Sequence, residues 1–343
     1  MEFIDLRSDT VTWPTREMRE SMLVAQVGDD VYGDDPATNR LQELAAKILN
    51  KEAALFVPTG TMGNQLAVFT HIQRGDEVIL PEDNHIVAHE GGAAAIIAGA
   101  SLRCLPSDKG IMDLTKVEET IRTGEDIHEP KTGLICTENA HSTGVVHPLS
   151  YMKELYALAQ KTNLPVHLDG ARLFNAAAYL KVDAAEIAQY ADSVMFCLSK
   201  GLCAPVGSML VGSRSFIEAA RRKRKLLGGG MRQVGVLAQA GILALEKMAG
   251  RLHEDHEQAL YLAQSLNRLP ELEVFMEDVH INMVFLRIKR PLEGHALASA
   301  MKREGILINP PQGGILRLVT HYYVGREQVD KVVEVLKNFL NQS

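Results

Sequence analysis

Length, composition and charge are those of an ordinary folded protein. The chain has 343 residues, of which 46% are hydrophobic and 23% charged, and this suits a globular protein with two domains. A net charge of −7 and a pI near 6.0 give no reason to expect nucleic acid as a partner. No apolar run approaches the roughly 20 residues of a membrane helix, so we expect no membrane partner either.

The N-terminus and the cysteines bear on the compartment. The first ten residues, MEFIDLRSDT, carry charges where a signal peptide needs an apolar run. Four cysteines are present, but no two of them form a CxxC pair. A reduced, cytoplasmic location is the simplest interpretation.

Two stretches near the N-terminus are rich in polar residues. Residues 1–15 are broken by Pro14 and are too short to be a domain, so we expect them to lie on the rest of the protein. Their Ser8 either caps a turn or offers its hydroxyl to a ligand. Residues 28–36, GDDVYGDDP, predict an ordered loop. This loop lacks the Glu and the spacing of a calcium site, so we expect no metal, and its Tyr32 is expected to face the active site or a neighbouring subunit.

A phosphate seat is predicted where an apolar segment runs through Pro58-Thr59-Gly60-Thr61 into a helix. Such a turn presents free backbone N–H groups and the positive end of the helix dipole, with the Thr61 hydroxyl as a further donor. No GKS or GKT follows, so it is not a Walker A loop. Many turns between a strand and a helix look alike, and a purely structural turn is the alternative.

Two histidines follow in polar surroundings. His85 lies just past the apolar strand 77–80, where an imidazole can stack on an aromatic cofactor and move protons near neutral pH. His128 lies in a polar loop between a helix near 113–122 and a strand at 134–139. A structural role is the alternative for His85.

The strongest chemical signal is the pair Asp169 and Lys200. Asp169 directly follows one apolar strand, and Lys200 lies two residues after the end of the next. About two helical segments separate these strands. This spacing fits a strand–helix–strand unit, in which ligands lie beyond the carboxyl ends of the strands. A lysine with limited access to water can condense with an aldehyde, and an aspartate can keep a pyridine nitrogen protonated. The pair predicts a pyridoxal phosphate (PLP) site, against the alternative of a helix cap and a surface lysine.

Three arginines lie at positions that can serve such a site. Arg172 is one helical turn beyond Asp169. Arg232 follows three glycines, 228–230, and this flexible turn can bring it to a phosphate in the same or an adjacent subunit.

After a long helical segment at about 234–265, strands alternate with helices, which predicts a smaller α+β domain. Arg317 in that part is either a solvent-facing strand residue or a clamp for a carboxylate.

Seven segments together give the chain a clear resemblance. It resembles the threonine aldolase family, the low-specificity L-threonine and L-allo-threonine aldolases, over nearly its whole length. The segments are IDLRSDTVT, VGDDVYGDDP, PTGTMGN, HLDGARLFNA, CLSKGL, GGGMRQ and RLVTH. The resemblance implies an α/β fold of the aspartate aminotransferase type (fold type I). It also implies an N-terminal segment (1–15), a large PLP-binding domain with a mainly parallel sheet (16–248) and a small C-terminal α+β domain (249–343).

The resemblance also implies how pyridoxal 5'-phosphate is held. Lys200 carries the Schiff base, Asp169 pairs with the pyridine nitrogen and His85 stacks on the ring. Gly60 and Thr61 hold the phosphate, with further help from a basic residue of a neighbouring subunit, Arg232.

Around the substrate, the resemblance implies that Ser8, Arg172 and Arg317 surround the carboxylate and the phenolic oxygen of the ring. It implies a homotetramer, a dimer of dimers with active sites between subunits, which suits the loop of Tyr32. His89 departs from the family pattern, in which some relatives have an aromatic residue at this position.

The implied reaction is retro-aldol cleavage of L-threonine, L-allo-threonine or both to glycine and acetaldehyde, or another aldehyde, through a quinonoid glycine carbanion. Arg317 orients the substrate so that Cα–Cβ is the bond that breaks, and we expect His85 and His128 to share the transfer of the hydroxyl proton. The alternatives are a PLP-dependent β-eliminating lyase and a non-catalytic protein with the same fold.

Overall fold

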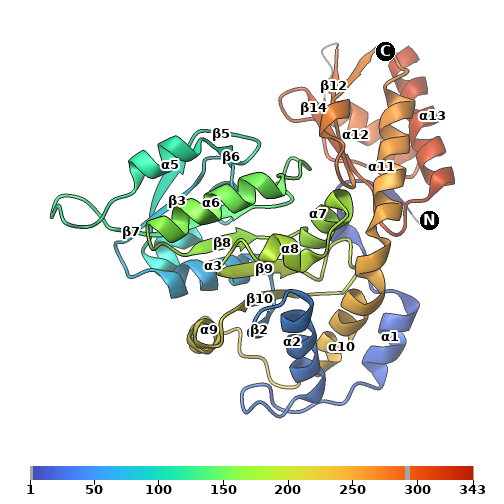
Figure 1. Ribbon diagram of the computed structural model, residues 1–343. Coiled ribbons are helices and arrows are strands. Elements are labelled where there is room, and N and C mark those ends of the chain that lie inside the picture. The colour runs from blue at the N-terminus through green and yellow to red at the C-terminus, as the bar shows by residue number, and fades with distance from the viewer. Residues whose placement is uncertain (1–2, 290–293, 343) are drawn as a thin grey trace.

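The computed structural model describes residues 3–289 and 294–342. Figure 1 shows a broad α/β body built on one large sheet, with a smaller assembly of strands and helices beside it that contains the C-terminus. Within the described residues, no helix combines the length and the apolar character needed to cross a membrane.

The large sheet has seven strands and is mainly parallel, as predicted. Only β10 runs against its two neighbours, β2 and β9. The other adjacent pairs are parallel. The strand order is β2 (Ala53–Val57), β10 (Ser208–Gly212), β9 (Ser193–Cys197), β8 (Val166–Asp169), β7 (Thr132–Glu138), β3 (Glu77–Pro81) and β4 (Ser101–Leu105).

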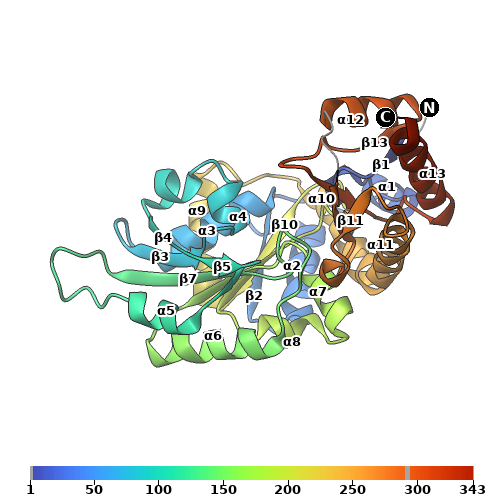
Figure 2. The same ribbon diagram turned by 90° about the horizontal axis from the view of Figure 1, so that it is seen from above.

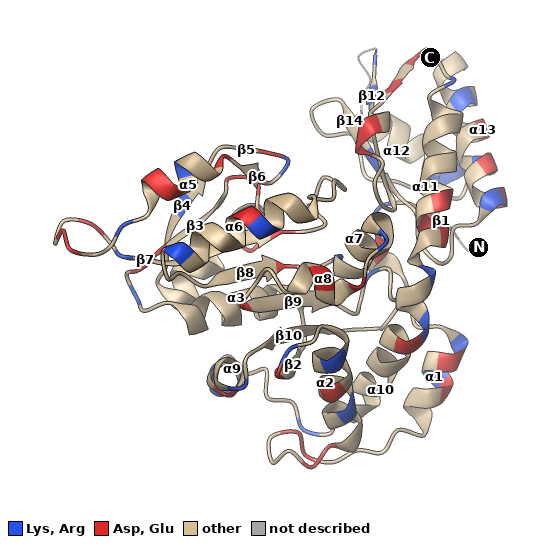
Figure 3. Ribbon diagram, viewed as in Figure 1, with Lys and Arg blue, Asp and Glu red and all other residues tan. Residues whose placement is uncertain are grey.

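Alternate residues along the central strands belong to different cores, because both faces of the sheet are covered. In β3, Val78 and Leu80 pack on one face while Ile79 packs on the other. In β9, Met195 and Phe196 are divided in the same way. Burial on both faces explains why these strands read as continuous apolar runs in the sequence. Figure 3 shows the charged residues mostly on helices and loops, with the strands of the sheet largely free of them.

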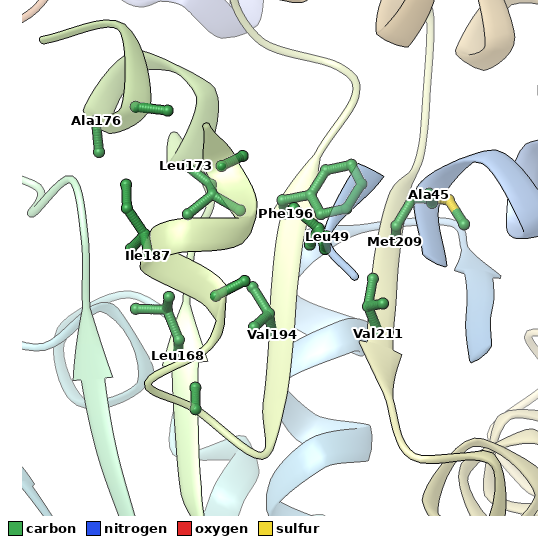
Figure 4. Packing of buried hydrophobic residues seen from close by; sticks show 14 of the residues in the cluster. Ala45, Leu49, Leu168, Leu173, Ala176, Ile187, Val194, Phe196, Met209 and Val211 are labelled. Carbon is green, nitrogen blue, oxygen red and sulfur yellow. The ribbon is translucent and has the colours of Figure 1, made fainter. Parts of the chain in front are cut away.

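Helices cover the two faces as separate layers, which Figure 2 shows along the sheet. One layer contains α3 (Gly60–His71), α4 (His85–Ala88) and α9 (Arg214–Leu226). The other contains α2 (Pro36–Ile48), α5 (Leu114–Thr120), α6 (Leu149–Lys161), α7 (Leu173–Leu180), α8 (Ala184–Ala188) and α10 (Gly235–Leu243). Figure 4 shows part of this second core, where Phe196 of β9 lies close to Leu49, the C-cap of α2.

The helices begin where local chemistry favours it. Thr59 caps α3 by accepting a hydrogen bond from the N–H of Met62. Asp35 caps α2 in the same way, with Pro36 at the first helical position. The helical segment predicted at 234–265 is present but interrupted. It consists of α10, a π-helical turn (Ala244–Met248), a 3₁₀ turn (Ala249–Arg251) and α11 (Leu252–Leu266). Gly250 in the interrupted part weakens helix propensity.

A second hydrophobic core forms around the C-terminal strands. The antiparallel strands β11 (Leu272–Val274), β12 (Met283–Ile288) and β14 (Ile315–Val319) pack with α11, α12 (Gly294–Arg303) and α13 (Arg326–Gln342). The N-terminus joins this core, since β1 (Ile4–Asp5) pairs in parallel with β13 (Ile306–Leu307) and Leu6 is buried there. Helix α11 contributes Leu252 to the first core and Leu262 to the second. The domain boundary at residue 248 stays a prediction.

Candidate active site

Asp169 and Lys200 line the same cavity. Asp169 is the last residue of β8 and Lys200 follows the end of β9, and these two strands are parallel neighbours. Their carboxyl ends therefore meet at one edge of the sheet. A cavity of about 300 Å³ lies at this edge, and six of the residues around it are Thr12, Gly60, Thr61, His85, Asp169 and Lys200.

The cavity lies against the start of α3. Helix α3 begins at Gly60, and Pro58, Thr59, Gly60 and Thr61 all line the cavity. A Cβ atom added at Gly60 would lie 3.0 Å from Sγ of Cys197, which is tighter than most Cβ contacts, so glycine suits this close approach of the backbone. The first N–H groups of a helix are free to bind an anion.

Asp169 is held from two sides and is fully buried. One carboxylate oxygen accepts a hydrogen bond of 2.7 Å from Nδ2 of Asn64, and the other accepts one of 3.0 Å from the N–H of Ala171. Nearby Glu138, at the end of β7, is also buried. Burial raises the pKa of Glu138, and the charge of Asp169 raises it further.

His85 is oriented by two carboxyl groups. Its backbone N–H donates to Glu138 at 3.0 Å, and its ring Nδ1 lies 2.9 Å from Oε1 of Glu90, whose side chain is fully buried. The hydrogen bond to Glu90 raises the pKa of His85, although burial opposes this. With Nδ1 donating to a carboxylate, the neutral ring has its lone pair on Nε2. His85 is therefore prepared to accept a proton at Nε2.

The N-terminal segment forms one wall of the cavity. Thr10 and Thr12 line it, and Oγ1 of Thr12 donates to the carbonyl oxygen of Lys200 at 2.8 Å. The hydroxyl of Ser8 accepts a hydrogen bond from the N–H of Thr10 and so caps a short 3₁₀ turn.

Arg172 is tied to a buried carboxylate. Its Nε and Nη2 donate to the two oxygens of Asp9 at 2.8 and 2.6 Å. Burial alone would raise the pKa of Asp9, but the charge and hydrogen bonds of Arg172 outweigh it and lower that pKa to about 2. This pair fixes the N-terminal segment to the helix that follows Asp169.

Arg317 lies in a second, larger cavity of about 660 Å³. His89, Phe275 and Phe285 also line it. The rings of His85 and His89 are 5.4 Å apart, and each lines one of the two cavities, so the cavities are adjacent. Nη2 of Arg317 donates to the carbonyl oxygen of Arg7 at 3.2 Å. Burial, with some repulsion from Arg172, lowers the pKa of Arg317.

Besides Ser8, Arg172 and Arg317, three of the predicted site residues do not line the Asp169–Lys200 cavity of this chain: Tyr32, Arg232 and His128. Tyr32 is 78% exposed. Arg232 is half-exposed and pairs with Asp29 at 2.8 Å. His128 is exposed in the loop 121–131, which precedes β7 and projects at the left of Figure 1. That loop enters the sheet at the amino end of β7, whereas Asp169 is at the carboxyl end of β8. The structure therefore does not bring His128 to His85 within one chain.

Several residues of the site are missing from the sequence prediction. Thr12 belongs to the same polar segment as Ser8, so its hydroxyl was the available signal. Glu90 is five residues after His85, and in the sequence nothing distinguishes it from a surface carboxylate. Among the described residues, the ligand atoms of His85, Glu90 and Asp169 lie close enough to hold a metal ion. Hydrogen bonds also explain why these atoms lie close together. Asn64 donates to both Glu90 and Asp169, and the ring of His85 is hydrogen-bonded to Glu90. The expectation of no metal stays a prediction.

These groups match the chemistry of PLP. The cavity combines an amine on Lys200, a buried carboxylate on Asp169 that can pair with a protonated pyridine nitrogen, and a helix N-terminus at Gly60 that can receive a phosphate. The fold and this set of groups define a PLP-dependent enzyme of fold type I.

Comparison with known proteins agrees and is more specific. A family model described as beta-eliminating lyase matches residues 5–289. The low specificity L-threonine aldolase of Escherichia coli (strain K12) is 46% identical over 340 residues, 98% of this chain and 99% of the relative. The low-specificity L-threonine aldolase 1 of Arabidopsis thaliana is 43% identical, over 96% of this chain and 94% of the relative. The chain belongs to the threonine aldolase family of PLP-dependent lyases.

Solved structures at lower identity establish the fold. A threonine aldolase from Leishmania major has a TM-score of 0.82 at 20% identity, over 98% of this chain and 99% of that one. A serine palmitoyltransferase from Sphingomonas wittichii has a TM-score of 0.78 at 17% identity, over 99% and 88%. The same fold thus occurs in proteins named for different reactions, so the fold alone does not determine the reaction.

Proposed function

We propose that this protein cleaves L-threonine, L-allo-threonine or both between Cα and Cβ, giving glycine and acetaldehyde or another aldehyde, with PLP as cofactor. The observation that carries the proposal is the shared cavity of Asp169, Lys200 and the start of α3, in a chain 46% identical to a low specificity L-threonine aldolase. Bound PLP supplies an electron sink for the negative charge left on Cα.

Five residues of this chain are proposed to hold the aldehyde carbon, the ring and the phosphate of the cofactor. Lys200 binds its aldehyde carbon covalently and Asp169 pairs with its pyridine nitrogen. His85 stacks on the ring. Gly60 and Thr61 hold the phosphate, which the position of both residues at the start of α3 supports.

Arg317 is proposed to bind the substrate carboxylate. Its guanidinium lines the cavity next to that of Lys200, and a planar guanidinium suits a bidentate contact with a carboxylate. This contact fixes the rotation about the bond to Cα and so selects Cα–Cβ for cleavage. Ser8 and Arg172 are proposed to complete the surroundings of the carboxylate and of the phenolic oxygen of the cofactor. Two of the three guanidinium nitrogens of Arg172 donate to Asp9.

His85 is proposed to accept the proton of the β-hydroxyl. The hydrogen bond from Nδ1 to Glu90 leaves Nε2 as the accepting atom. His128 is proposed to share this transfer. Because its loop lies away from the cavity of its own chain, that share requires the loop 121–131 of another subunit.

A homotetramer with active sites between subunits is part of the proposal. The exposure of Tyr32 and of Arg232 supports it, since both side chains are available to a neighbouring copy, where Arg232 would reach the phosphate. The cytoplasm is the proposed compartment, which agrees with four free cysteines. A large PLP-binding domain (16–248) and a small domain (249–343) are the proposed division.

The deciding experiment is product analysis with PLP on L-threonine and L-allo-threonine in parallel, with Lys200→Ala as the inactive control. Glycine and acetaldehyde in equal amounts are expected, and the ratio of the two rates gives the stereochemical preference. The match to a beta-eliminating lyase model favours one rival, elimination. Ammonia with a keto acid in place of glycine and aldehyde would establish that rival and overturn the aldolase.

A further inference from the structure

A row of polar side chains connects two residues of α3, Asn64 and His71, to the strands β8 and β9 beneath Asp169. Nε2 of His71, the last residue of α3, lies 2.7 Å from Oγ of Ser193 on β9. Oγ of Ser193 lies 2.9 Å from Nδ1 of His167 on β8. Nε2 of His167 lies 3.1 Å from Oδ1 of Asn64 in α3. Asn64, Ser193 and His167 are fully buried.

Asn64 uses both of its N–H groups on carboxylates. Nδ2 donates to Asp169 at 2.7 Å and to Glu90 at 2.8 Å. The opposite orientation of the amide would place Oδ1 against two carboxylate oxygens, which repel it. Oδ1 therefore faces His167 and needs a donor there.

This requirement sets the direction of every other bond in the row. His167 must donate from Nε2, so Nδ1 of the neutral ring is an acceptor. Ser193 has one hydroxyl proton and gives it to that Nδ1, which leaves its oxygen to accept from Nε2 of His71. Burial lowers the pKa of His167 to about 4, which keeps the ring neutral as this arrangement requires. One set of proton positions thus satisfies all the side-chain hydrogen bonds of the row.

We propose that Asn64 and His167 are positioning residues of the cofactor site: His167 holds the amide of Asn64 with its NH2 group toward Asp169 and Glu90. The inference rests on the proposed function, because Asp169 is the partner of the pyridine nitrogen there. The start of α3 seats the phosphate and β8 carries Asp169, so the same bonds fix the two contact points of the cofactor relative to each other. Glu90, which accepts a hydrogen bond from Asn64, is also hydrogen-bonded to the ring of His85, so the row of bonds extends to that ring.

The test compares two substitutions of His167 that differ in which ring nitrogen they imitate. In His167→Gln the amide nitrogen replaces Nε2 and still donates to Asn64. In His167→Asn the shorter side chain replaces only the Nδ1 side and cannot reach Asn64. His147→Gln is the matched control, since His147 is also a buried histidine but bonds to the carbonyl oxygen of Lys109 instead.

PLP affinity is measured by titrating each PLP-free protein. The dissociation constant is expected to stay within about threefold of wild type for His167→Gln and His147→Gln. It is expected to rise about fivefold to a hundredfold for His167→Asn, the range for leaving a buried acceptor, here Oδ1 of Asn64, without its donor. If both His167 variants weaken PLP binding equally, His167 has a merely structural role and the proposal is overturned. No weakening by either would overturn the proposal.

A second measurement does not depend on cofactor binding. In ¹⁵N-histidine NMR spectra of the PLP-free wild type at neutral pH, His167, assigned from the signal lost in the variants, is expected as the Nε2–H tautomer. The Nδ1–H tautomer would overturn the proposal even if PLP binds. A wild-type chain that takes up no PLP would instead overturn the cofactor assignment.

If the His167 variants do not fold, Asn64→Asp keeps the shape of the side chain but places an oxygen against Asp169 and Glu90. Its PLP affinity is expected to fall at least tenfold, and wild-type affinity would refute the role of Asn64.

Discussion

Replacing Asp9 with asparagine removes the charge that faces Arg172 inside the protein. Burial alone would raise the pKa of Asp9, but the guanidinium of Arg172 outweighs it and moves that pKa from its ordinary 3.8 to about 2. A difference of about two pKa units corresponds to about 2–3 kcal/mol in favour of the ionised group in the folded protein. Asparagine resembles the neutral carboxyl group, and it also leaves Arg172 without its partner. Breaking a buried pair in this way costs about 3–5 kcal/mol.

The free energy of unfolding is measured by urea denaturation of the PLP-free protein at neutral pH, where Asp9→Asn should lower it by about 3–5 kcal/mol without a change in m. Asp5→Asn is the matched control. Asp5 pairs with Arg7 at 2.6 Å, but the side chain of Arg7 is 44% exposed, so this pair should contribute less than about 1 kcal/mol.

The pH dependence gives a second check. A carboxyl group whose pKa is lower in the folded protein binds protons more readily in the unfolded chain. The stabilisation by Asp9 is therefore complete above about pH 4 and is lost as the pH falls toward 2. The difference in the free energy of unfolding between wild type and Asp9→Asn should be constant near neutral pH and should become smaller below about pH 4. If Asp9→Asn lowers the free energy of unfolding at neutral pH no more than Asp5→Asn does, the reasoning is refuted.

Three further outcomes are expected. Lys200→Ala should abolish covalent attachment of PLP, measured by borohydride reduction and mass spectrometry; a reducible adduct in the variant would assign the attachment to another lysine. Arg317→Ala should weaken amino-acid binding about tenfold to a hundredfold, measured by titration of the PLP-loaded protein, with little effect on PLP affinity; equal loss of both would place Arg317 at the cofactor. Glu90→Gln should lower the pKa of His85, because the hydrogen bond to Glu90 is the main cause of its rise; an unchanged NMR titration of His85 would show that another group raises it.

The sequence predicts the centre of the site because local rules place it. Asp169 and Lys200 each lie at or just past the end of a buried strand, and the helical spacing between them makes those strands parallel neighbours. The same logic locates Gly60 at the start of α3. Strand ends and helix starts are set by residues close in sequence, so these positions can be read from the chain.

Contacts between distant residues are not readable in this way. Asp9 and Arg172 are 163 positions apart, and in the sequence neither has a pattern that selects the other. The reversed direction of β10 also depends on long-range packing, because its apolar run suits either direction. The role of His128 comes from the resemblance, and the loops around Tyr32 and Arg232 left the same chain or a neighbouring subunit as alternatives. One chain leaves all three residues outside the Asp169–Lys200 cavity.

The pairing of β1 with β13 has a consequence for the order in which the protein is made. Ile4 pairs with Ile306, so β1 leaves the ribosome about 300 residues before the strand that it pairs with. At roughly 5–20 residues per second, this delay is about 15–60 s. Thr10 and Thr12 lie a few residues after β1, and until β13 has been made their segment is held only by contacts with the large sheet region, such as that of Asp9 with Arg172. A nascent chain that already has the strands of Asp169 and Lys200 therefore still lacks one of the attachments that hold this wall of the binding site.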